Sequence, residues 1–159
     1  MTAKSDFSDE EWARIVRAPF VAGLAISLAD PGGPIEAAKE TMATLKSATN
    51  PPSREQLLAE VALEIQAMTQ QRQNPLKGYK PTKDSPPGPQ ILDELAAVQD
   101  IVVAKATPEE SAAYGRWIQA TAQDAANAAK EGGFMGFHAQ RVSQGEQAML
   151  DQVSAAVTR

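Results

Sequence analysis

Hydrophobic residues recur every three or four positions along most of the chain, which is the spacing of one face of an α-helix. The stretch from about 54 to 72 shows this most clearly, with an aligned apolar set: Leu58, Val61, Ile65 and Met68. The same spacing predicts further helices over about 9–30, 34–47, 90–105, 108–131 and 144–158. Sustained period-two alternation is missing from the sequence, so no strand is predicted.

The second of these helices, 34–47, has a single apolar stripe, and such a stripe is the side by which a helix usually packs. Its members are Ile35, Ala38, Met42 and Leu45. The first and fifth helices are rich in alanine at spacings of three and four, which allows close approach of two helices. They are expected to be the central members.

Signals for helix starts recur in the form of the capping box, in which Ser or Thr is followed three residues later by Glu or Gln. Four pairs fit: Ser8 with Glu11, Ser53 with Gln56, Thr107 with Glu110, and Ser143 with Glu146. At the first, Phe7 and Trp12 also occupy the positions of a hydrophobic staple. These signals support the helical assignment and place the starts.

A proline-rich stretch, residues 74–90, separates the third and fourth helices. Its prolines disfavour helix and central strand, so we expect a long exposed connection. The whole pattern predicts an all-α fold, a compact bundle of about six helices forming one domain over residues 1–159.

Composition limits the classes of function that this protein can have. The 15 basic and 20 acidic residues give a net charge of −5 without a basic stripe, which argues against nucleic acid as a partner. The chain has no cysteine, and this excludes disulfides, thiolate metal sites and cysteine nucleophiles. The polar, acidic start does not resemble a secretory signal, and the longest apolar run, 18–29, is shorter than a membrane span, so a cytoplasmic location is expected.

The most unusual stretch is "KEGGFMGFHAQRVS", residues 130–143, which combines three glycines, two phenylalanines and the only histidine. Phe134, Met135 and Phe137 can either plug the end of the bundle or form a flexible binding loop for a protein partner or a small apolar ligand. His138 and Arg141 complete the candidate site on this loop. Tyr114 and Trp117 on the fifth helix are further candidates, with core packing as the alternative.

Two other functions are compatible with the same part of the chain. A small helical enzyme would use His138 with Arg141 and Glu110, in a pocket near the end of the fifth helix. Peripheral membrane attachment would use the loop from Phe134 to Phe137, although the acidic charge opposes binding to anionic lipid. No cofactor is implied, since one histidine cannot supply a helical di-iron site.

Two further features of the sequence each have a functional and a structural interpretation. Glutamates one turn apart, Glu36 with Glu40 and Glu60 with Glu64, have a spacing that suits a magnesium ion, but solvated helix faces carry such pairs as well, and no metal is expected. Within the proline-rich stretch, basic residues gather on an acidic protein: Lys77, Lys80 and Lys83, with Tyr79 among them. They suit an acidic partner or a groove for extended chain, and otherwise form a solvated linker.

The segments "GRWIQATAQDAANAAKEGGFMGF" and "VSQGE", with "APF" and "GLA" in an acidic, Trp-containing first helix, resemble those of a family of small bacterial all-helical proteins. The resemblance covers both ends of the chain but not the proline-rich middle. It implies an all-α fold and a bacterial origin, and it carries no activity, cofactor or partner. We therefore expect a non-enzymatic helical bundle that binds a partner or a small apolar ligand, or self-associates, through loop 132–138.

Overall fold

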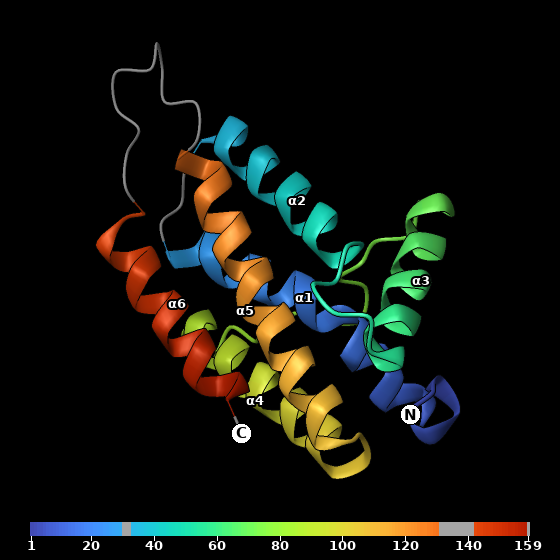
Figure 1. Ribbon diagram of the computed structural model, residues 1–159. Coiled ribbons are helices and arrows are strands. Elements are labelled where there is room, and N and C mark those ends of the chain that lie inside the picture. The colour runs from blue at the N-terminus through green and yellow to red at the C-terminus, as the bar shows by residue number, and fades with distance from the viewer. Residues whose placement is uncertain (30–32, 131–141, 159) are drawn as a thin grey trace.

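The computed structural model describes residues 1–29, 33–130 and 142–158, and the side chains of residues 129 and 130 are excluded. Over this part of the chain every regular element is a helix (Figure 1). The elements are the short 3₁₀ helix Lys4–Asp6, α1 Asp9–Ala29, α2 Pro34–Ala48, α3 Gln56–Gln70, α4 Pro87–Lys105, α5 Pro108–Lys130 and α6 Gln144–Val157. The predicted all-α bundle of six helices is confirmed.

The boundary of α4 differs from the prediction. The helix begins at Pro87, three residues earlier than expected, and includes Pro89. A proline is harmful inside a helix because it lacks an N–H, but the first N–H groups of a helix have no partner within it. Pro87 and Pro89 both occupy this first turn, so the exposed connection is shorter than the proline content indicated.

Two of the predicted capping boxes are formed. The Glu11 N–H donates to Ser8 Oγ (3.1 Å), and the Ser8 N–H donates to Glu11 Oε1 (2.9 Å). The same reciprocal pair joins Ser143 and Glu146 at the start of α6. Each box supplies partners for groups that a helix terminus leaves unpaired.

The other two predicted boxes, at Ser53 and Thr107, are not formed as predicted, and Glu110 of α5 is involved in both. The box at Ser53 is wrong, because α3 begins at Gln56 without a side-chain cap from Glu55, and Ser53 Oγ accepts from Glu55 N (3.3 Å). The N–H of Leu57, in the first turn of α3, instead donates to the Glu110 carboxylate of α5 (3.2 Å). Thr107 Oγ1 does cap Glu110 N (3.1 Å), so the third box is half formed.

Helix α5 lies at the centre of the bundle, between α2 and α6 in Figure 1, and packs on α1 as well. Its aromatic side chains donate hydrogen bonds to backbone carbonyls of other helices. Tyr114 Oη donates to the Ile15 carbonyl of α1 (2.7 Å), and Trp117 Nε1 donates to the Ser47 carbonyl of α2 (2.8 Å). The expected central position of the first and fifth helices is confirmed.

The remaining helices meet α5 at neighbouring positions. Gln99 of α4 donates through Nε2 to the Ser111 carbonyl (3.0 Å), in the first turns of α5. Gly115 faces the end of α6, where a Cβ at this position would lie 2.6 Å from the Val157 carbonyl oxygen. Only a residue without a side chain allows the two backbones to approach so closely.

Helix α2 is turned opposite to the prediction. Of its apolar stripe (Ile35, Ala38, Met42 and Leu45), Ile35 and Met42 are 69% and 73% exposed. The buried side chains are mostly polar: Glu40, Thr44 and Ser47, followed by Ala48. Leu45 alone of the four packs partly on the core, so apolar spacing identified the wrong face for the rest of the stripe.

Hydrogen bonds and small side chains account for the orientation of α2. Ser27 Oγ of α1 donates to Glu40, and Ser47 Oγ lies 3.0 Å from Thr121 Oγ1 of α5. Thr44 packs so closely on α1 that a Cβ on Gly23 would come within 2.5 Å of its Oγ1. Polar groups can be buried when they are hydrogen-bonded, and this face satisfies that condition.

Among the described helices, α1 alone is long and apolar enough by composition to cross a membrane. Most of its apolar stretch is buried against the other helices, as expected of a core helix. The cytoplasmic location stays a prediction.

The close approach at Gly115 gives a test of the packing. We expect Gly115→Ala to lower the free energy of unfolding by about 1–3 kcal/mol, because the new methyl group meets a backbone carbonyl that cannot rotate away. Gly88→Ala is the matched control: its Cβ would lie 3.6 Å from Met149 Cε, an ordinary contact, so a change of at most about 0.5 kcal/mol is expected. Urea denaturation of both variants measures the difference, and equal stabilities would contradict the close approach.

Candidate functional site

The predicted binding loop lies outside the described residues. This applies to Phe134, Met135, Phe137, His138 and Arg141. Their role in binding stays a prediction.

The two candidate residues on α5 are described, and they lie inside the core. Trp117 and Tyr114 are 0% and 1% exposed, and their rings meet edge to face at 6.1 Å. Burial raises the pKa of Tyr114 well above its ordinary value. Because the polar atom of each donates to a backbone carbonyl, their contacts support the core interpretation that the sequence left open.

The paired glutamates are engaged by protein groups. Glu60 accepts from the Lys4 backbone N–H (2.7 Å), and Glu64 pairs with Lys4 Nζ (3.4 Å). Glu40 accepts from Ser27, one turn after the partly exposed Glu36. In the described ranges, no group of three or more acidic or histidine side chains is placed to hold a metal ion.

Two side chains of the mostly exposed stretch that follows α3 pack on the bundle. Leu76 and Tyr79 both contact the core. Arg17 of α1 donates through Nη1 to the Lys77 carbonyl (3.0 Å), and Gly78 adopts φ 88°, where a Cβ would lie 2.6 Å from that nitrogen. The expectation of a solvated linker is therefore wrong for Leu76 and Tyr79, while Lys77 and Gly78 are exposed as expected.

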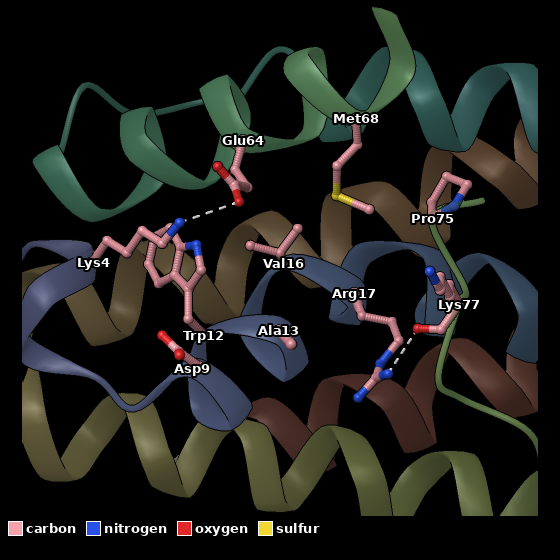
Figure 2. Close-up of a pocket in the computed structure, with 10 residues that line it drawn as sticks. All are labelled: Lys4, Asp9, Trp12, Ala13, Val16, Arg17, Glu64, Met68, Pro75 and Lys77. Carbon is pink, nitrogen blue, oxygen red and sulfur yellow. Dashed lines mark hydrogen bonds and ion pairs between the residues drawn. The ribbon is translucent and has the colours of Figure 1, made fainter. Parts of the chain in front are cut away.

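A cavity of about 310 Å³ lies between α1, α3 and this packed segment (Figure 2). Helix α1 supplies one wall, with residues one turn apart such as Trp12 and Val16. Met68 of α3 and Pro75 add apolar surface from the other side. The volume is at the lower end of the range of small-molecule sites.

Trp12 is the notable residue in the wall of this cavity. Its side chain is 4% exposed, and no acceptor for its Nε1–H exists among the described residues. The predicted staple is present, since the Phe7 and Trp12 rings lie 6.0 Å apart, so the indole is held by packing. A buried donor without an acceptor costs on the order of 1–3 kcal/mol. In Figure 2 the indole nitrogen lies on the edge of the ring turned toward Val16 and Glu64.

Charged side chains surround the same cavity. Lys4, Arg17 and Lys77 are basic, and Asp9 and Glu64 are acidic, which leaves an excess of one positive charge on an acidic protein. Arg17 Nε is also buried, and no acceptor for it lies in the described part of the chain. The cavity therefore combines apolar walls with hydrogen-bond donors that a ligand could use.

Glu110, the carboxylate of the enzyme hypothesis, lies in the first turn of α5. The hypothesis required a pocket near the end of that helix, but Glu110 is twenty residues before Lys130, about 30 Å along the axis. Its oxygens accept from Thr2 N (3.2 Å), Thr2 Oγ1 (2.9 Å), Thr107 Oγ1 (3.2 Å) and Leu57 N. Glu110 thus joins the N-terminal segment, α3 and α5.

Comparisons with protein-family models, with curated proteins and with solved structures found no match. The resemblance to small bacterial all-helical proteins, and the bacterial origin that it implies, stay predictions.

The buried position of Glu110 predicts a pH dependence of stability. Burial raises its pKa, but the hydrogen bonds from Thr2, Thr107 and Leu57 outweigh burial and hold the pKa below its ordinary value. The stabilisation is then complete above the pKa of an unfolded glutamate, about 4.3, and is lost as the pH falls through the lower folded value. We expect Glu110→Gln to lower the free energy of unfolding at neutral pH by about 1.5–3 kcal/mol.

Urea denaturation across the acidic range measures this effect. The exposed neighbour Glu109→Gln is the matched control and should keep the pH profile of the parent. Glu110→Gln should flatten the profile below about pH 4.3, because the titrating group is gone. An unchanged profile would show that Glu110 does not carry the dependence.

Proposed function

We propose that this protein binds a small amphiphilic molecule, with an apolar body and a hydrogen-bond-accepting or anionic group, in the cavity between α1 and α3. The observation that carries the proposal is the Trp12 indole N–H, buried in the cavity wall and without an acceptor in the described chain. Buried polar groups are nearly always hydrogen-bonded, so a bound acceptor would complete the site.

The lining supports a ligand that is both apolar and negatively charged. Ala13, Val16, Met68 and Pro75 present aliphatic surface, which favours a hydrocarbon or aromatic body. Indole and guanidinium nitrogens donate hydrogen bonds and do not accept them, so they favour an acceptor over a donor. The basic excess around the cavity favours an anion over a cation.

Binding is proposed instead of catalysis because the groups of this cavity serve recognition. An indole N–H is not an acid–base group at neutral pH, and Lys4 and Glu64 pair with each other. The class of function is the one that the sequence predicted, but the site is on α1 and α3. Loop 132–138, with a protein partner or self-association, stays a separate hypothesis.

The test uses 8-anilinonaphthalene-1-sulfonate, an apolar anion that becomes fluorescent when it enters an apolar site. We expect one saturable site on the folded protein and a loss of affinity of about tenfold or more in Ala13→Phe, because the ring fills the cavity from its exposed edge. Ala112→Phe, at an exposed position of α5, is the matched control and should bind as the parent does.

Trp12→Phe tests the polar part of recognition separately. It keeps an aromatic ring in the wall and removes the N–H together with part of the apolar indole surface, so we expect the probe to bind at least about two- to tenfold more weakly, the value of one hydrogen bond. Circular dichroism verifies that each variant is folded. Binding that neither Ala13→Phe nor Trp12→Phe reduces would place the probe elsewhere and overturn the proposal.

A further inference from the structure

The cavity next to Trp12 is the first of three hollows that follow one face of α1. The second, of about 370 Å³, is lined by Phe20, and the third, of about 110 Å³, by Phe20, Gly23 and Ser27. Together with Trp12 and Val16, these residues recur at intervals of three and four, so they lie on one stripe of the helix. The stripe from Trp12 to Ser27 is about 22 Å long.

Neighbouring hollows also share their opposite walls. Pro75 lines the first and second hollows, and Leu76 lines the second and third. Helix α3 contributes Met68 to the first and Thr69 to the second. Adjacent residues of one segment thus line successive hollows, and we call this row of three hollows along α1 the groove.

The polarity of the groove changes along its length. The first hollow has the buried Trp12 N–H and the basic excess described above. The middle is apolar, with Phe20, Leu45 and Leu76, and has Arg72 at its exposed rim. The third hollow is narrow, and its lining includes an acidic residue, Glu40, and no basic one. The charge of the lining therefore disfavours an anionic group at the far end, and the buried Trp12 N–H favours one in the first hollow over the middle.

We infer that the groove takes a linear aliphatic carboxylate, with its carboxylate beside Trp12 and its chain running along α1 past Pro75 toward Phe20 and Leu45. The inference rests on the proposed function and adds the class of ligand and its direction. A chain without branches suits the groove because the hollows succeed one another along one helix face. Each methylene that becomes buried contributes about fourfold to affinity.

The experiment compares hexanoate with dodecanoate, whose additional methylenes extend past Pro75 under this inference. Isothermal titration calorimetry of the whole protein, below the micellar range, gives both affinities. We expect dodecanoate to bind about tenfold or more tightly than hexanoate, since its additional methylenes enter the second hollow. Trp12→Phe should weaken both carboxylates by the same factor.

Leu45→Trp fills the second hollow from the half-buried side of α2. We expect it to remove most of the advantage of dodecanoate while leaving hexanoate unchanged. Met42→Trp, on the same helix but 73% exposed, is the matched control and should preserve the advantage. Circular dichroism verifies the fold of both variants.

The outcomes separate the two proposals. Equal affinities for hexanoate and dodecanoate, or an advantage of dodecanoate that survives Leu45→Trp, would overturn the elongated site and leave the Trp12 cavity in place. Failure of the carboxylates to bind, with the sulfonate probe still bound beside Trp12, would overturn the choice of ligand class alone. If the probe also fails to bind, the proposed function fails with it.

Discussion

The fold depends on a set of buried polar contacts made by the first half of α5. Four residues between 110 and 117 each make a hydrogen bond to a different helix. Glu110 accepts from α3, the Ser111 carbonyl accepts from α4, Tyr114 donates to α1 and Trp117 donates to α2. Hydrogen bonds are directional, so they fix the rotation of each helix about its axis, which hydrophobic burial alone does not. One segment thus sets the orientation of four others.

Helix α2 shows how these hydrogen bonds affect the orientation of a helix. Its buried face carries Glu40, Thr44 and Ser47. Ser27 of α1 donates to Glu40, Ser47 pairs with Thr121 of α5, and Thr44 donates to the Glu40 carbonyl of its own helix while packing against α1. Two of its large apolar side chains, Ile35 and Met42, are exposed, while Leu45 packs partly on the core. The hydrogen bond from Trp117 requires the Ser47 carbonyl to face α5, and this requirement outweighs burial of the apolar stripe.

The helices were predictable because their signals are local. The capping boxes at Ser8 and Ser143, and the apolar stripe of α3, depend only on residues within one or two turns, and each agrees with the structure. The orientation of α2 and the cap of α3 were not predictable, because each depends on a side chain distant in sequence. Glu110 lies 53 positions from the N–H that it accepts from at Leu57.

The candidate site was likewise only partly predictable from local sequence signals. Trp12 was identified from sequence as a packing residue, and its contact with Phe7 confirms that role. Spacing says nothing about which edge of an indole meets an acceptor, so the buried N–H could not be inferred. The groove along α1 also requires Pro75 and Leu76 to pack on the helix, while their proline-rich surroundings indicated an exposed connection.

The two tryptophans of the chain occupy different kinds of environment. Trp117 is sealed in the core and donates to the Ser47 carbonyl, while Trp12 borders the cavity. The two indoles are therefore separate natural chromophores. We expect emission from Trp117 to follow unfolding of the bundle, and emission from Trp12 to follow the polarity of the cavity that it borders.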